Sequence, residues 1–271
     1  MEMQLRHDVK GAYTIWYRDV LRFVRDRSRI FGSLAQPLLF LFALGFGLGS
    51  MLSRVGAGQP GGIVGVAYIE FLFPGILCMT VLFTALFSAI SIVWDREFGF
   101  LREVLVAPVS RTAVGLGKVA GGSTVAMIQG AIIMLIGPLL GVHYDALKII
   151  EMLLVLLLLA AVITSLGILI AARQKTMEGF QVIMQFLLLP MLFLSGAFFP
   201  LVSGTTAGDV LRIIAQFNPV SYGVDALRQI ALEGKLPATY ALHPPGVDVL
   251  FLIGFFILFL VPGVALFSKQ D

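Results

Sequence analysis

The sequence predicts an all-α integral membrane protein with six transmembrane helices, and three observations support this fold class. Of the 271 residues, 58% are hydrophobic and only 13% are charged, whereas soluble domains average roughly 45–50% and 25%. The mean hydropathy is +0.96. The apolar residues gather in six segments, each close to the ~20 residues that cross a ~30 Å hydrocarbon core. One integrated membrane bundle therefore fits the sequence better than two soluble domains.

Residues 1–29 are predicted to form an amphipathic helix in the membrane interface. Apolar residues share one face at helical spacing, namely Leu5, Val9, Ala12, Trp16 and Phe23. Arginines share another face, namely Arg18, Arg22, Arg25 and Arg29. Aromatic anchors opposite a basic stripe are typical of helices that lie on anionic lipid. The alternative is a basic arm for nucleic acid, which is disfavoured because the apolar face leads directly into a membrane span. We therefore expect membrane lipids, and no nucleic acid, as partners.

Residues 30–271 are predicted to form one membrane domain. Its spans cover approximately residues 30–52, 69–93, 113–137, 149–171, 179–200 and 247–267. Lysine and arginine set the orientation of such a bundle, because they are enriched in cytoplasmic loops. Fourteen of the 19 lie on the side of the amino terminus, and five lie opposite: Arg54, Lys148, Arg212, Arg228 and Lys235. We expect a multi-pass protein of the bacterial cytoplasmic (inner) membrane with both termini in the cytoplasm.

Several catalytic and cofactor motifs do not occur in the sequence. A phosphate-binding G-x-x-x-x-G-K-[ST] loop is missing. The most similar run, residues 115–119, lacks the four-residue spacing between the glycines and the serine or threonine after the lysine. Cys78 is the single cysteine, which excludes a cysteine cluster, and the three histidines lie far apart. Acidic residues sit at the edges of the spans, unlike the buried groups of proton-coupled carriers. We therefore predict no catalytic residue, no metal site and no cofactor on this chain.

The connection between the second and third spans is predicted to contain a short amphipathic helix at about residues 94–107. Trp94, Phe98, Leu101 and Leu105 share one face, while Asp95, Arg96, Arg102 and Glu103 share the other. Pro108 ends the helix. Such a helix lies across the cytoplasmic ends of the spans and can dock into a groove on a partner. The alternative is a solvated interfacial linker.

This segment carries a resemblance to a known family. Arg96-Glu97-x-Gly99, followed by Leu101, Leu105, Pro108 and Ser110-Arg111, resembles the cytoplasmic signature of the permease subunits of ABC-2 type transporters. Two later runs, residues 194–200 and 217–222, are similar to the features that this family places between its last two spans. The group includes drug-resistance, nodulation-factor and polysaccharide exporters. Phe100 and Arg102 depart from the common pattern, which leaves the detailed contacts at these two positions open.

The resemblance implies a cytoplasmic nucleotide-binding ATPase subunit in two copies, which holds ATP and Mg²⁺, and a second copy of this chain. The residues that it implies for coupling to the ATPase are Arg96, Glu97, Gly99, Leu101, Arg102, Glu103, Leu105 and Pro108. Those that it implies for an external gate are Gly196, Phe198, Pro200, Asn218, Pro219, Asp225 and Arg228. The expected function is export of an amphipathic, drug-like or lipid-linked substrate, driven by ATP that the partner hydrolyses.

Other features of the sequence leave alternatives open. Residues 201–246 form the longest external segment and are predicted to be partly re-entrant, the alternative being an ordinary loop with an apolar edge. Gln181 and Gln185 share one face of the fifth span and fit either a polar lining of the substrate path or hydrogen bonds between helices. Two other functions also remain: a membrane-embedded lipid-modifying enzyme, or a scaffold or sensor subunit paired with an ATPase. The enzyme requires a polar catalytic cluster at one membrane face, which the sequence does not reveal.

Overall fold

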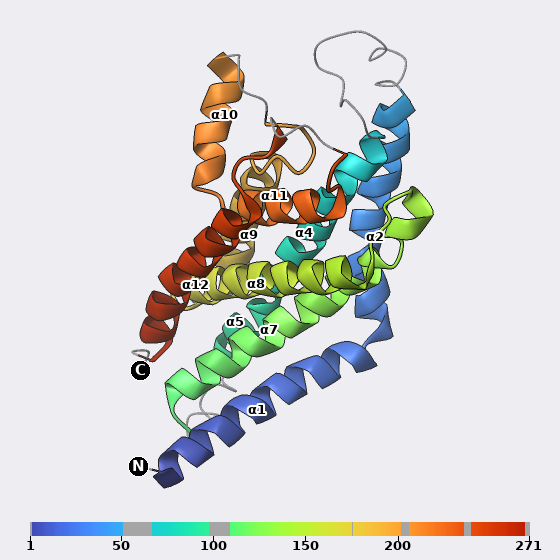
Figure 1. Cartoon of the computed structure of the whole chain (residues 1–271). Helices are drawn as coiled ribbons and strands as arrows, with labels where there is room; N and C mark the ends of the chain where they lie inside the picture. The colour runs from blue at the N-terminus through green and yellow to red at the C-terminus, as the bar shows by residue number, and fades with distance from the viewer. Residues whose placement is uncertain are drawn as a thin grey trace.

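The computed structural model describes residues 2–50, 67–97, 109–174, 176–201, 206–235 and 240–268. Within these ranges the regular structure is entirely helical, which confirms the all-α part of the predicted fold class (Figure 1). The helices are α1 (Glu2–Arg25), α2 (Arg27–Phe42), η1 (Ala43–Leu48), α4 (Tyr68–Ser88), α5 (Ile90–Glu97), α7 (Arg111–Met134), η2 (Gly137–Leu140), α8 (Ala146–Ala171), α9 (Met177–Phe193), α10 (Thr206–Gln216), α11 (Pro219–Ala231) and α12 (Pro245–Ser268).

Five helical stretches of the described chain are long and apolar enough to cross a membrane. They are Ile30–Leu48, Tyr68–Trp94, Arg111–Met134, Ala146–Ala171 and Pro245–Leu266. Helix α9 is also apolar but has 17 residues, which gives it a length of about 26 Å. The sequence predicted a fifth span that continued to residue 200, whereas the helix ends at Phe193. It stops there because the chain turns at Gly196, whose φ of +77° is a left-handed conformation that a helix does not contain.

Helix α1 packs along α7 at one end of the bundle (Figure 1). The indole N–H of Trp16 donates to Thr124 Oγ1 at 3.0 Å. Lys118 is buried in α7 and lies 3.6 Å from the carboxylate of Asp19. A carboxylate oxygen of Asp8 accepts a hydrogen bond from the backbone N–H of Ser110 at 2.7 Å, one residue before α7 begins. The amino-terminal helix is therefore fixed to the third span by polar contacts, and its place at a lipid surface stays a prediction.

Helix α4 forms the centre of the bundle, because its residues from Phe71 to Leu82 are buried on all sides. It packs against α2, α7, α8 and α11, and α12 lies along α8. The outer faces of α2, α9 and α12 carry exposed large apolar side chains, among them Leu39, Phe186 and Leu258. Exposed apolar side chains on these three helices are what a lipid environment or a further subunit requires.

Candidate functional site

The segment between the last two spans contributes a buried helix at the end of the bundle opposite α1 (Figure 1). Helix α11 has 13 residues, about 20 Å, too short to cross a ~30 Å hydrocarbon core. It is nevertheless buried along most of its length against α4, α8 and α12. This arrangement is consistent with the partly re-entrant segment that the sequence predicted. Helix α10, in contrast, contacts mainly α11 and exposes Val210 and Ile213.

Asn218 and Pro219, two residues of the predicted external signature, determine where α11 begins. The side-chain oxygen of Asn218 accepts from the backbone N–H of Val220 at 3.1 Å, and Pro219 occupies the first helical position. Asparagine before a proline is a favoured helix start, because it satisfies a free N–H while proline lacks one. The amide of Asn218 also donates to the carbonyl of Met191 at 2.6 Å. The start of α11 is thereby held against the end of α9.

Arg228 connects α11 to the turn that follows α9. Its guanidinium donates to the carbonyl oxygens of Gly196 and Ala197 at 2.9 and 3.4 Å. It also lies 3.8 Å above the centroid of the Phe71 ring, a cation–π contact. Burial lowers the pKa of Arg228 to about 10, so the side chain stays protonated at neutral pH. The turn lies so close to α4 that a Cβ at Gly75 would clash with the backbone of Ala197.

Phe198 is buried within the same turn. Its ring packs on those of Phe40 and Phe193, with centroids 5.9 and 5.2 Å away. Its carbonyl accepts from the hydroxyl of Tyr68 at 3.1 Å, and Pro200 follows in a half-buried position. Three residues that the resemblance assigned to an external gate therefore meet over the first turns of α4, namely Gly196, Phe198 and Arg228. Asn218 lies apart from them, at the other end of α11.

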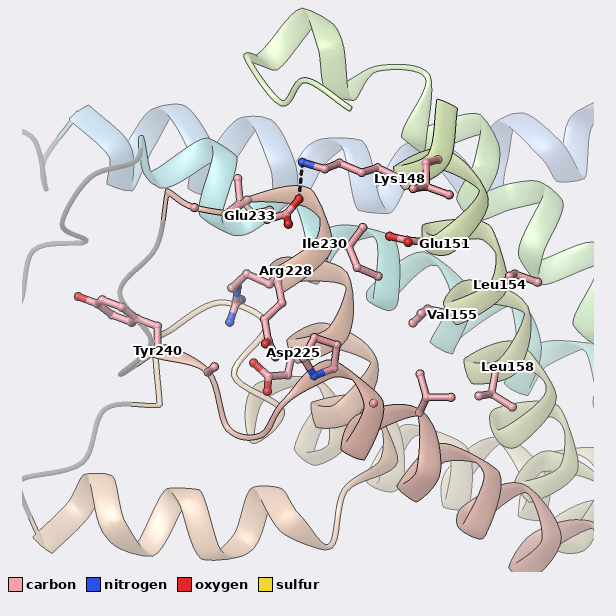
Figure 2. Close-up of a pocket in the computed structure, with 18 of the residues that line it drawn as sticks. Lys148, Glu151, Leu154, Val155, Leu158, Asp225, Arg228, Ile230, Glu233 and Tyr240 are labelled. Atoms are coloured by element: carbon pink, nitrogen blue, oxygen red, sulfur yellow. Dashed lines mark ion pairs between the residues drawn. The ribbon is translucent and has the colours of Figure 1, made fainter. Parts of the chain in front are cut away.

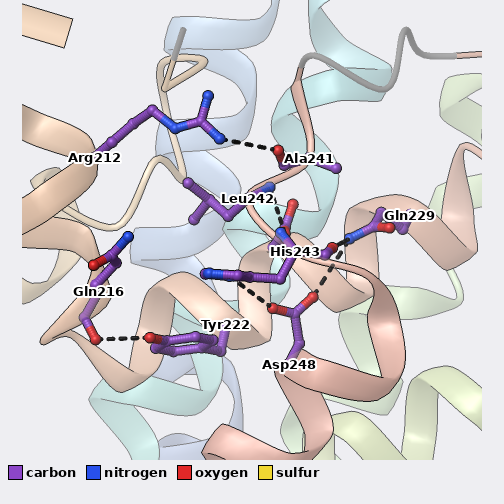
Figure 3. A network of polar contacts seen from close by, with 9 residues as sticks. Arg212, Gln216, Tyr222, Gln229, Ala241, Leu242, His243 and Asp248 are labelled. Carbon is purple, nitrogen blue, oxygen red and sulfur yellow. Dashed lines mark hydrogen bonds and ion pairs between the residues drawn. The ribbon is translucent and has the colours of Figure 1, made fainter. Parts of the chain in front are cut away.

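Asp225 forms the other side of this region, together with the chain that leads into α12. One of its carboxylate oxygens accepts from the backbone N–H groups of Leu242 and His243 at 2.8 and 3.1 Å. Burial raises the pKa of Asp225, and these N–H groups and the Arg228 charge oppose the shift. Gln229 donates to the carbonyl of His243 and to Asp248 in the first turn of α12, at 2.8 and 3.4 Å (Figure 3).

Sequence reasoning missed His243 and Asp248. Asp248 is fully buried, and its carboxylate lies 3.7 Å from the His243 ring (Figure 3). The ring of His243 stacks on that of Tyr222, with centroids 5.6 Å apart. A signal existed in the spacing, because His243 precedes by five residues an aspartate at the start of a strongly apolar segment. Their approach to Asp225, however, depends on the fold. The structure thus contains the kind of polar cluster at one end of the bundle that the sequence did not reveal.

A cavity of about 1070 Å³ opens between α8, α11 and α12 beside this cluster (Figure 2). One wall is apolar and comes from Leu154, Val155 and Leu158 of α8. Apolar residues of α11 and α12, such as Ile230 and Val249, also line it, and so do charged residues, namely Asp145, Lys148, Glu151, Asp225, Arg228 and Glu233. Lys148 and Glu233 form an ion pair at 3.0 Å across its rim. The lining is therefore amphipathic, mostly apolar but with charged side chains from both α8 and α11.

The predicted coupling segment is described only at its beginning. Helix α5 ends at Glu97, whose carboxylate accepts from the backbone N–H of Met177 at the start of α9, at 3.1 Å. The structure includes Arg96 in α5 but does not describe its side chain. The remaining coupling residues lie outside the described residues: Gly99, Leu101, Arg102, Glu103, Leu105 and Pro108. Their contact with an ATPase stays a prediction.

Gln181 and Gln185 are both exposed on α9. They share the outer surface of that helix with Val182 and Phe186, which are 68% and 82% exposed. Neither glutamine lines the cavity between α8, α11 and α12. Their role in a substrate path is untested and depends on what covers this face.

Long apolar helices around a buried polar end define a multi-pass membrane protein. Residues 11–232 match the family model of the ABC-2 type transporter. The chain is 29% identical over 246 residues to nodulation protein J of Rhizobium leguminosarum bv. trifolii, a match that covers 90% of this chain and 89% of that protein. It is 32% identical over 222 residues to the transport permease ycf38 of Cyanophora paradoxa, covering 81% of this chain and 73% of that protein.

The chain therefore belongs to the ABC-2 type transporter family. It is a permease of that family, and the family implies partnership with an ATP-binding subunit.

Proposed function

We propose that this chain is the membrane-spanning subunit of an exporter that moves an amphipathic, drug-like or lipid-linked molecule out of the cytoplasm or inner leaflet. The cavity between α8, α11 and α12 carries this proposal. Its volume of about 1070 Å³ is at the upper end of the range for small-molecule sites. A mostly apolar lining that also carries charged side chains suits a ligand with one apolar and one polar part. Family membership supports transport as the class of activity.

Energy comes from ATP and Mg²⁺ bound by two copies of a cytoplasmic nucleotide-binding subunit. The residues around 94–107 seat in that subunit and transmit its closure to the spans. The hydrogen bond from Met177 to Glu97 supports this role, because it connects the start of the segment to the first turn of α9. A displacement of α5 would thereby be transmitted to α9.

A second copy of this chain covers the outer face of α9. Gln181 and Gln185 lie there among apolar side chains, and an amide that faces lipid alone forgoes its hydrogen bonds. A facing copy, or a polar path between two copies, supplies the missing partners. In a Cys78→Ala background, Gln185→Cys should form a disulfide-linked dimer in membranes. The matched control is Leu258→Cys on the exposed face of α12, which should not.

Both termini lie in the cytoplasm, and the protein resides in the inner membrane. The excess of lysine and arginine on the amino-terminal side supports this orientation. Reporter fusions at Asp271 and within residues 201–246 should report opposite sides of the membrane. The same side for both would contradict the topology.

The function is tested by purifying the chain in mild detergent with its ATPase and reconstituting the pair in liposomes. We expect equal amounts of the two subunits and ATP-dependent movement of an amphipathic fluorescent lipid. Lipid modification by the chain without the ATPase would favour the membrane enzyme instead. A stable complex that hydrolyses ATP but moves none of a panel of amphipathic substrates would favour a scaffold or sensor. Asp225, His243 and Asp248 form a polar cluster of the kind that the enzyme alternative requires, but family membership favours transport.

A further inference from the structure

Three side chains with metal-ligand atoms meet beside α11, although they come from three different segments. Asp225 lies in the middle of α11, His243 in the connection that follows it, and Asp248 in the first turn of α12. One ligand atom from each lies within 4.8 Å of the others. Asp225 is 3% exposed and Asp248 is fully buried. The two carboxylates are therefore enclosed by the fold, while the side chain of His243 is 25% exposed.

The facing atoms of His243 and Asp248 lack hydrogen-bond partners within the described residues. Oδ1 of Asp248 and Nδ1 of His243 are both buried, and neither forms a hydrogen bond within the described residues. They lie 3.7 Å apart, which is beyond hydrogen-bond range. An unpaired carboxylate oxygen in a buried site is costly, by roughly 1–3 kcal/mol or more. When His243 is neutral and its Nδ1 is unprotonated, two electron-pair donors face each other across this gap, an arrangement that a shared cation satisfies.

The rest of the cluster is already held in place by other contacts. Two backbone N–H groups fix one oxygen of Asp225, and Gln229 fixes the second oxygen of Asp248. The ring of His243 is stacked on Tyr222 (Figure 3). Hydrogen bonds of this kind orient the ligands of metal sites and hold them in register. The three ligand groups thus need little rearrangement to bind an ion.

The charge of the cluster also favours a bound cation or a proton shared between the two carboxylates. Asp225 and Asp248 are two buried carboxylates in close proximity, and like charges in such a site repel each other strongly. The guanidinium of Arg228 is directed to the carbonyls of Gly196 and Ala197 and to the ring of Phe71. It therefore offers Asp248 no direct partner among the contacts that the structure shows.

We propose that Asp225, His243 and Asp248 form a binding site for a divalent transition-metal ion of the zinc class. An imidazole nitrogen with two carboxylate oxygens suits zinc better than magnesium or calcium, which prefer oxygen alone. Zinc–ligand bonds of about 2.0–2.2 Å at tetrahedral angles place two ligand atoms roughly 3.4 Å apart. The 3.7 Å between Nδ1 and Oδ1 is close to that separation. Asp225 borders the cavity, so water reaches a fourth position from that side.

The ion joins α11 to the start of α12 and closes the loop formed by residues 240–244. It thereby fixes the segment that also holds Arg228 against the turn at Gly196. This site is independent of the proposed transport function, because its test reads metal binding alone.

The test uses the full-length chain in mild detergent with an affinity tag that contains no histidine. His7→Ala and His143→Ala are introduced as a background, so that His243 is the single remaining histidine. The protein is treated with a chelator, and Zn²⁺ is then titrated by calorimetry. We expect one ion per chain and a rise in thermal stability with added zinc. Co²⁺ in place of zinc should give the visible absorption of a four-coordinate site.

Asp248→Asn and His243→Gln retain side-chain size and should each weaken zinc binding at least tenfold. Glu151→Gln is the matched control, because it removes a carboxylate from the same cavity without touching the cluster. It should bind zinc as the background chain does. The proposal is overturned if the background chain retains no zinc after gel filtration, a result that does not depend on any cluster variant folding. Equal affinity in the Asp248→Asn and background chains would overturn it as well.

Discussion

Replacing Arg228 by alanine is the most informative single change at the outer end of the bundle. The side chain joins three elements, since it starts in α11, donates to the carbonyls of Gly196 and Ala197, and covers the ring of Phe71 in α4. Its removal leaves those carbonyls buried without their donor. We therefore expect Arg228→Ala to destabilise the packing of α11 on α4 and α9.

The size of the effect follows from these contacts. A hydrogen bond to a charged group contributes about 1.5–3 kcal/mol, and a desolvated cation–π contact about 2 kcal/mol. Part of this is offset because the guanidinium no longer needs to be buried. A net loss of about 3–5 kcal/mol remains, as for other buried charged groups that lose a partner. For a chain of this size each kcal/mol lowers Tm by roughly 2–4 °C, so we expect a fall of roughly 6–20 °C.

Cys78 provides the assay, because it is the only cysteine and is fully buried in α4. A thiol-reactive fluorophore therefore reports unfolding as the purified protein is heated. Arg212→Ala is the matched control, since it removes an arginine with one hydrogen bond, to the carbonyl of Ala241 at 3.3 Å. Its Tm should fall by only a few degrees. If Arg228→Ala and Arg212→Ala unfold at the same temperature, the structural role assigned to Arg228 is wrong.

The remaining predictions concern the opposite end of the bundle. Lys118→Ala should lower the free energy of unfolding by roughly 2 kcal/mol, because it leaves Asp19 without its buried partner. In the same thermal assay, the double variant Asp19→Ala/Lys118→Ala should be less destabilised than the sum of the two single variants. Gly117→Leu should push α1 away from α7, because Ala12 contacts the glycine directly; unchanged protease resistance of α1 would count against this. Glu97→Ala should preserve membrane insertion while it uncouples ATP hydrolysis from transport. Normal transport by this variant would indicate that residues 94–107 are only a linker.

The fold class was predictable because it depends on long, uninterrupted apolar runs. Five of the six predicted spans appear as long apolar helices. The remaining one, the predicted fifth span, corresponds to α9, which ends seven residues before the predicted limit of residue 200. Residues 194–200 are largely apolar and look like part of a span by hydropathy alone. The positive φ of Gly196 is incompatible with a continuous helix through these residues. The sequence alone does not show which backbone conformation a glycine adopts within an apolar segment.

The outer site was predictable only in part. Gly196, Phe198 and Arg228 were named from the resemblance to a family, and the structure brings them together. Their contact surface on α4 was not predictable, because Phe71 and Gly75 look like any other residues of an apolar span. His243 and Asp248 were missed for a different reason. Their approach to Asp225 follows from a reversal of the chain between α11 and α12, which no local spacing in the sequence specifies.

Two antiparallel membrane helices are joined at both of their ends, and this arrangement connects the two regions discussed above. At one end, Glu97 accepts from the first residue of α9. At the other, the hydroxyl of Tyr68 at the start of α4 donates to Phe198 beyond the end of α9. Helices α4 and α5 run between these points with one break, at Ala89. Sliding α5 along α9 would break a polar contact at each end, so we expect the two helices to move together. We therefore expect a displacement that begins at Glu97 to reach the turn held by Arg228, and loss of the Glu97 carboxylate should then uncouple the two ends without unfolding either.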